Sequence, residues 1–126
     1  MNRTRYADIP VYVTKDGSEI RELMHPDSHA ARNQSLAEAT VCPGHRTHLH
    51  RHHRTEEIYH VTAGQGRMTL GEEVLAVGPG DSILIPPDTP HCIEAIGYEP
   101  LRILCCCSPA YSHEDTELLE AGITET

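Results

Sequence analysis

Residues 44–57 hold the pattern that decides the fold, and they read Gly44-His45-Arg46-Thr47-His48-Leu49-His50-Arg51-His52-His53-Arg54-Thr55-Glu56-Glu57. Six of the ten histidines of the chain lie between positions 45 and 60. His50 and His52 are separated by one residue, and residues i and i+2 of a strand point to the same face of a sheet. Imidazole and carboxylate are ligands that suit Zn, Fe, Mn, Ni and Cu. The stretch therefore predicts a mononuclear metal site.

A second segment completes the expected ligand set. The run 58–61 is strand-like, and Gly64 and Gly66 mark a tight turn after it. His91 lies 39 residues after His52, and antiparallel strands bring such distant segments together. We expect one divalent transition metal per chain (Fe, Mn, Ni, Zn or Cu), with positions left open for a further ligand. The predicted protein ligands are His50, His52, Glu57 and His91.

The stretch resembles the first motif of the cupin superfamily. That motif reads Gly, five residues, His-x-His, three or four residues, Glu, six residues and Gly. It is matched at every step by Gly44, His50, His52, Glu57 and Gly64. Glu56 is the alternative carboxylate, because the family tolerates three or four intervening residues. We prefer Glu57 because six residues then separate it from Gly64.

The second cupin motif is matched less fully. It reads Gly, five residues, Pro-x-Gly, two residues, His, three residues and Asn. Asp88 stands at the position of the Gly that follows the Pro, and Ala95 at the position of the Asn. These departures affect a turn and a position beside the ligands, not the implied ligands themselves. The matching residues are Gly80, Pro86 and His91.

The resemblance implies an all-β fold, the double-stranded β-helix or jelly-roll barrel of the cupins. At 126 residues we expect a single cupin domain over residues 1–126. Within it, residues 1–17 are expected to be an irregular lead-in and residues 108–126 a C-terminal tail. Cupins commonly pair subunits through the outer face of a sheet, so the resemblance also implies a homodimer. Ile58 and His60 are expected on that face.

Short apolar runs separated by turn signals favour the same fold. They recur roughly every 8–12 residues, which is typical of an all-β sandwich or barrel. Residues 116–121 are the one hint of a helix, with Asp115 or Thr116 as its cap. Strands are expected at 20–23, 36–41, around His50 and Glu57, and at 67–70, 74–77, 82–85, 91–96 and 101–107.

Strand parity predicts which side chains face the cavity. If Glu57 points inward, so do the residues two and four positions on, and Ile58 points outward. A hairpin at 97–100 would set Cys105 or Cys107 opposite His91. The thiols could equally be small buried hydrophobes, and Tyr59 a core residue. The candidates for pocket lining are His48, Tyr59, Met68, Ile93, Cys105 and Cys107.

Composition limits the partners and the compartment. The 19 acidic and 10 basic residues give a formal charge of −9, which argues against binding nucleic acid or an anionic membrane. The N-terminus lacks the apolar core of a signal peptide, and no apolar run approaches the length of a membrane span. Five cysteines, three of them consecutive, fit neither a disulfide framework nor a zinc spacing. We expect a cytoplasmic protein with free, mostly buried thiols.

The first functional hypothesis is a metal-dependent enzyme that acts on a small organic substrate. An oxygenase is the favoured subclass, because open positions allow a substrate to chelate beside oxygen. The alternatives are a non-catalytic ligand-binding or sensor cupin, an isomerase, cyclase or lyase, and a fold with a structural zinc that fills all four positions with protein ligands. A solvated histidine tract explains neither Glu57 nor His91. No residue stands out as a separate catalytic acid or nucleophile.

Overall fold

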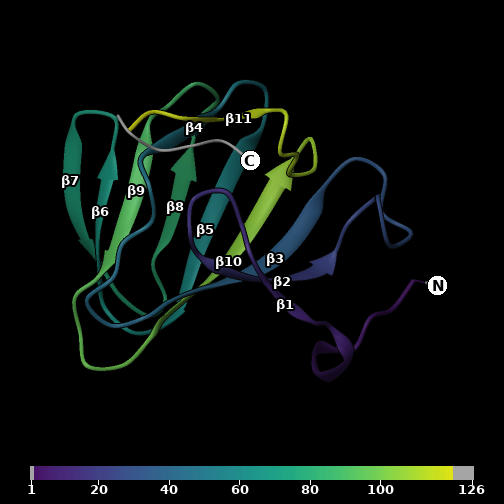
Figure 1. The fold of residues 1–126 in the computed structure, drawn as a ribbon, viewed down its shortest axis with the longest axis horizontal. Coiled ribbons are helices and arrows are strands. Elements are labelled where there is room, and N and C mark those ends of the chain that lie inside the picture. The colour runs from purple at the N-terminus through teal and green to yellow at the C-terminus, as the bar shows by residue number, and fades with distance from the viewer. Residues whose placement is uncertain (1, 121–126) are drawn as a thin grey trace.

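The regular structure of the chain is almost entirely β (Figure 1). The computed structural model describes residues 2–120. Within them a short 3-10 turn, η1 (Tyr6–Asp8), precedes eleven strands. The strands are β1 (Val11–Val13), β2 (Glu19–Met24), β3 (Ser35–Val41), β4 (His50–His52), β5 (Glu56–Ala63), β6 (Gly66–Leu70), β7 (Glu73–Val77), β8 (Ser82–Ile85), β9 (His91–Ala95), β10 (Leu101–Ser108) and β11 (Thr116–Leu118).

The strands form two antiparallel sheets. One has six strands in the order β1-β2-β3-β10-β5-β8, and the other has five in the order β11-β4-β9-β6-β7. The chain passes from one sheet to the other after β3, β4, β5, β7, β8, β9 and β10. This repeated crossing is the double-stranded β-helix, so the predicted jelly-roll fold is confirmed.

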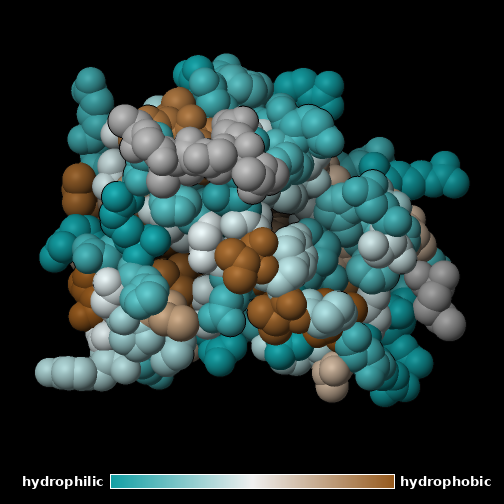
Figure 2. Space-filling model, in the orientation of Figure 1, coloured by the Kyte–Doolittle hydropathy of each residue, from teal (hydrophilic) through white to brown (hydrophobic). Residues whose placement is uncertain are grey.

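The core lies between the two sheets and follows the period-two alternation of each strand. In β10 buried residues alternate with partly buried or exposed ones, and in β3 they alternate with partly buried ones. Because the chain has no Phe or Trp, aliphatic side chains and Met68 fill the interior. The predicted parity of β5 is confirmed, since Glu57 and Tyr59 are buried whereas Ile58 is 44% exposed. Polar residues dominate the face shown in Figure 2, with apolar side chains in scattered patches.

The two ends of the chain hold more regular structure than the sequence predicts. Residues 1–17, expected to be irregular, include η1 and the edge strand β1. The predicted helix at 116–121 is wrong, because Thr116–Leu118 is a strand that pairs with β4. Its last residue, Ala121, lies outside the described residues. A three-residue strand takes its conformation from the partner strand rather than from its own sequence preference.

The predicted hairpin between the last two long strands is also wrong. β9 pairs with β4 and β6, whereas β10 pairs with β3 and β5 in the other sheet. The turn residues at 97–100 therefore connect the sheets. As a result, Cys107 lies opposite Glu57, its registered partner in β5, and not opposite His91. No helix in the described part of the chain is long and apolar enough to cross a membrane.

One glycine of the histidine-rich motif has a clear steric role. Gly64 follows β5 with a φ of +82°, and a Cβ there would lie 2.5 Å from the Pro100 oxygen and 2.7 Å from Leu101 Cα. Gly44, at the other end of the motif, has a similar φ of +80°, but a Cβ there would meet no atom within 4 Å. Of these two glycines, Gly64 alone is required both because its φ is positive and because a side chain would collide with the backbone of residues 100 and 101.

We predict that Gly64→Ala destabilises the fold more than Gly44→Ala. The left-handed backbone alone costs about 1–2 kcal/mol in either variant. The contact with the backbone of residues 100 and 101 should raise the loss at position 64 to about 3–5 kcal/mol. Urea denaturation followed by circular dichroism measures both. Equal losses in the two variants would contradict the steric argument.

Candidate metal centre

Three histidines meet at the junction of two neighbouring strands. His50 and His52 project from the same face of β4, and His91 begins β9, where it is registered opposite His50. Their exposed fractions are 2%, 4% and 0%. One ring nitrogen of each histidine lies within 4.8 Å of one ring nitrogen of each of the other two. Such a cluster of buried imidazoles could hold a metal ion.

Hydrogen bonds on the far side of two rings fix the position of the proton. The Nδ1 atom of His50 lies 2.7 Å from the carbonyl oxygen of His48, and that of His91 lies 2.9 Å from the carbonyl oxygen of Thr89. A carbonyl oxygen can only accept, so each Nδ1 carries the hydrogen. In the neutral ring, Nε2 then presents a lone pair to the centre. This is the form in which histidine binds a metal.

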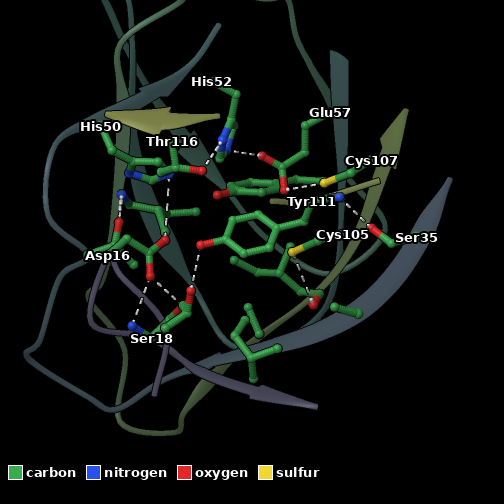
Figure 3. A pocket seen from close by; sticks show the side chains of 18 of the residues that line it. Asp16, Ser18, Ser35, His50, His52, Glu57, Cys105, Cys107, Tyr111 and Thr116 are labelled. Atoms are coloured by element: carbon green, nitrogen blue, oxygen red, sulfur yellow. Dashed lines mark hydrogen bonds and ion pairs between the residues drawn. The ribbon is translucent and has the colours of Figure 1, made fainter. Parts of the chain in front are cut away.

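His52 reaches the same state through a side chain. Its Nδ1 lies 2.9 Å from the hydroxyl oxygen of Thr116 (Figure 3). That hydroxyl donates to the Ser112 carbonyl at 2.9 Å. Because the hydroxyl hydrogen is used, the Thr116 oxygen accepts from Nδ1 of His52. The third Nε2 therefore also turns a lone pair to the centre. Thr116 belongs to β11, the strand that the sequence failed to predict.

Glu57 lies against two of the three histidines. Its Oε1 is 3.2 Å from Nε2 of His52 and 3.6 Å from Nε2 of His91. Its Oε2 accepts from the thiol of Cys107 at 3.4 Å. Glu57 Oε1 and His91 Nε2 are buried and have no hydrogen-bond partner. Electron pairs that face one another in this way are satisfied by a cation between them, so the residues fit a metal.

The electrostatics agree with this donor set. Burial, with some help from the neighbouring His91, lowers the pKa of His50 to about 4, so the ring is neutral at pH 7. Burial acts to raise the pKa of Glu57, but hydrogen bonding and positive charge from the His52 and His91 side outweigh it and the net shift is downward. A bound cation would supply the same charge while the rings stay neutral. Burial and the Glu57 charge raise the pKa of the Cys107 thiol, which keeps its proton. Three imidazoles and one carboxylate suit a divalent transition metal.

A small cavity, here called the inner cavity, adjoins the centre. Its volume is about 40 Å³, room for a few water-sized molecules. His50, His52 and Glu57 contribute to its wall. A second carboxylate, Asp16, also lines it, with Oδ2 3.7 Å from Nε2 of His50. Figure 3 shows Asp16 on the His50 side and Glu57 on the His52 side.

Asp16 is a site residue that the sequence did not predict, because it belongs to residues 1–17, which were expected to be an irregular lead-in. A turn directs its carboxylate to the cavity. The Asp16 Oδ1 accepts from the Ser18 amide at 2.9 Å and from the Ser18 hydroxyl at 2.6 Å, which leaves Oδ2 toward the cavity. The His48 amide donates to the Asp16 carbonyl at 2.7 Å and fixes the loop beside β4. The sequence Asp16-Gly17-Ser18 indicates a turn. It does not indicate that this turn contacts the segment before β4 and brings Asp16 beside His50.

The structure places some of the predicted lining residues elsewhere. His48 and Met68 are not among the residues that line the inner cavity. His48 precedes β4, so strand parity does not extend to it, and its ring faces Glu120 at 3.6 Å. Met68 is fully buried in the core between the sheets. The predicted residues that do line the cavity are Tyr59, Ile93, Cys105 and Cys107.

The cysteines are free, but most of them are not buried. Cys105 and Cys107 are buried, Cys92 is partly buried, and Cys42 and Cys106 are exposed. The expectation of mostly buried thiols is therefore wrong. Alternation along β10 turns Cys106 outward, Cys42 follows the last residue of β3, and Cys92 lies at a partly buried position of β9.

Comparison with known proteins identifies the fold family. Residues 37–107 match the family of cupin domains. The chain belongs to the cupin family. This cupin is 57% identical over 118 residues to an uncharacterized protein of Methanocaldococcus jannaschii, and the match covers 94% of each chain.

Two enzymes of known structure share the fold of this cupin. Pac13 of Streptomyces, a nucleoside dehydratase, superposes with a TM-score of 0.79 at 18% identity, over 95% of this chain and 92% of that one. Oxalate decarboxylase of Bacillus subtilis superposes with a TM-score of 0.78 at 24% identity, over 92% of this chain and 31% of that one. At these identities the likeness establishes the fold alone.

Thr116 gives a direct test of the hydrogen bonds behind the histidines. Thr116→Val keeps the size of the side chain but leaves the His52 N–H without an acceptor. We predict about 10- to 100-fold weaker metal binding, the usual effect of removing such a partner. Thr116→Ser, which keeps the hydroxyl, should bind metal like the parent protein. Competition with a chromophoric chelator measures all three affinities. Equal affinities for the Val and Ser variants would contradict this role.

Proposed function

We propose that this cupin is a metal-dependent enzyme that acts on a small organic substrate. One divalent transition metal would be held by His50, His52, His91 and Glu57. The observation that carries the proposal is the cluster of three buried imidazoles whose Nδ1 atoms are hydrogen-bonded away from the centre, two of which face a buried carboxylate oxygen of Glu57. The proteins of similar fold include a dehydratase and a decarboxylase, which supports a catalytic role.

The metal would supply a Lewis acid or a redox centre. The chain's own residues would set its surroundings. Cys107 holds one oxygen of Glu57 and so turns the other toward the centre. Ser18 holds one oxygen of Asp16 in the same way, and the free oxygen can accept a hydrogen bond from a substrate hydroxyl. Tyr59 and Ile93 line the inner cavity with apolar surface, which strengthens these polar contacts by excluding water.

Within this class we favour an oxygenase. The inner cavity, at about 40 Å³, has room for a diatomic molecule and the reacting end of a substrate, but not for a whole organic molecule. Its buried position would also protect a reactive species from water.

A lyase is the second candidate. It is favoured by Asp16, a second carboxylate positioned on the His50 side of the cavity. The dehydratase and decarboxylase activities of the structural neighbours point to the same class. An oxygenase must consume dissolved oxygen as it turns over, whereas a lyase turns over equally well under argon.

An open coordination position distinguishes either enzyme from a structural metal site. We predict that azide shifts the visible spectrum of the cobalt-substituted protein, because a position not filled by the protein accepts it. His91→Ala should weaken cobalt binding, and it serves as the control for site occupancy. A closed tetrahedral spectrum that ignores azide would favour a structural ion and would contradict the enzyme proposal.

We also propose that the protein works in the cytoplasm and does not bind nucleic acid. Five free cysteines support a reducing compartment. The formal charge of −9 opposes binding to a polyanion.

Homodimer formation is proposed from an apolar row on the outer face of the six-stranded sheet. Strand register places one residue from each of five neighbouring strands in this row. Ile58 is 44% exposed and Leu84 is 51% exposed. A second copy of the chain would remove this surface from water. The row consists of Met24, Leu36, Cys106, Ile58 and Leu84.

We predict that Ile58→Glu dissociates the dimer. A charge in the middle of the row would lose its hydration on association. Val74→Glu is the matched control, because Val74 is 64% exposed but lies on β7 of the other sheet. Sedimentation equilibrium should give twice the chain mass of 14.0 kDa for the parent and the control, and 14.0 kDa for Ile58→Glu. A parent protein that sediments as a monomer would contradict the proposal.

A further inference from the structure

A second, larger cavity adjoins the inner one and is here called the outer chamber. Its volume is about 680 Å³, within the range of small-molecule binding sites. Its lining residues come from three segments, 12–15, 22–28 and 111–118. All of them lie outside residues 37–107, the part that matches the cupin family. The metal centre thus comes from the shared part of the fold, and the chamber comes from the segments that flank it.

A thin wall of side chains separates the two cavities. Tyr12, Thr14, Glu22 and Tyr111 line both of them. The Thr14 and Tyr111 hydroxyls are hydrogen-bonded at 3.0 Å, and the Tyr12 hydroxyl donates to Glu22 Oε2 at 2.9 Å. A molecule in the outer chamber therefore lies one layer of side chains from the histidines. Since the inner cavity holds only a few water-sized groups, the body of a substrate needs the outer chamber.

Two basic side chains of the chamber wall are already hydrogen-bonded. His25 accepts from the Asp27 amide at its Nδ1, and its Nε2 donates to the Tyr111 carbonyl at 2.7 Å. The Lys15 ammonium donates to the backbone carbonyl oxygens of His113 and Thr116. These bonds stabilise the wall and direct both side chains toward backbone carbonyls.

Acceptors, in contrast, remain available. Glu22 Oε1 is a buried oxygen without a hydrogen-bond partner, and its residue lines both cavities. Asp27 and Glu114 add two carboxylates to the chamber, and Asp16 lies in the wall of the inner cavity. Carboxylates on several sides repel an anion, and a buried unpaired acceptor favours a ligand that donates. Val13, Leu118 and the tyrosine rings supply apolar surface beside these acceptors.

We propose that the outer chamber binds the body of the substrate, and that this substrate is a hydroxyl-rich molecule without negative charge, of the size of a monosaccharide. A substrate hydroxyl donates to Glu22 Oε1, and one end of the molecule reaches the inner cavity past Thr14 and Tyr111. Sugar rings combine hydroxyl donors with apolar C–H faces, which matches a wall of acceptors, aliphatic groups and aromatic rings. The claim that the bound molecule is transformed rests on the proposed function; the claim that it binds does not.

The test uses methyl NMR spectra of the full chain, titrated with D-glucose, its anion D-gluconate and its cation D-glucosamine. Val13 and Leu118 report on the outer chamber, and Ile93 and Ile103 report on the inner cavity. We expect glucose and glucosamine to shift the Val13 and Leu118 methyl signals, and gluconate to leave them in place. A response to gluconate equal to that of glucose, a response to glucosamine alone, shifts confined to Ile93 and Ile103, or no shift with any probe would overturn the proposal.

Glu22→Ala tests the recognising group. It should weaken glucose binding about ten- to a hundred-fold, as expected for the loss of one hydrogen bond to a charged group. Glu19→Ala is the matched control, because Glu19 lies on the same strand but does not line either cavity. Equal affinities in the two variants would overturn the role of Glu22.

Running the titration with and without bound cobalt separates the two proposals. Chamber shifts in a protein that binds no cobalt would leave the chamber standing and the metal proposal refuted. Cobalt binding without shifts of the Val13 and Leu118 signals would leave the metal proposal standing and would refute the chamber proposal.

Discussion

Three hydrogen bonds on the outer side of the histidine rings hold the candidate metal centre in its functional form. The carbonyl oxygens of His48 and Thr89 and the hydroxyl of Thr116 each accept from one Nδ1. Each bond fixes both the orientation of a ring and the tautomer that turns a lone pair inward. Two of the bonds are local and join each ring to the carbonyl two residues earlier, whereas the Thr116 bond forms only if β11 pairs with β4 in the observed register. The pairing of β4 with β9 then brings His91 beside His50.

A hydrogen bond also orients the carboxylate of the centre. The thiol of Cys107 and the carboxylate of Glu57 face one another because their residues are registered partners across β10 and β5. Burial and the nearby negative charge raise the pKa of the thiol, so it donates a hydrogen rather than competing as a thiolate ligand. One oxygen of Glu57 is held, and the other is free to face the histidines.

The local pattern of the sequence predicted much of this site. Spacing placed His50 and His52 on one face, and the expected antiparallel strands added Glu57 and His91 to the ligand set. The resemblance to cupins then favoured Glu57 over Glu56. Period-two alternation assigned Tyr59 and Ile93 to the interior, as observed. The predictions that failed concern contacts between segments that are distant in the sequence. The turn at 97–100 connects two sheets instead of forming a hairpin, and β11 is a strand because β4 pairs with it. Asp16 reaches the histidines through a loop that precedes the matched motif, which no local pattern signals.

X-ray absorption at the metal edge of the cobalt-loaded protein tests the central claim most directly. Three imidazoles give a characteristic multiple-scattering pattern, and the account predicts three of them together with oxygen ligands and no sulfur. His91→Ala should reduce the imidazole count to two. A sulfur scatterer, which would identify Cys107 as a ligand, would contradict the account. So would a spectrum that fits fewer than three imidazoles in the parent protein.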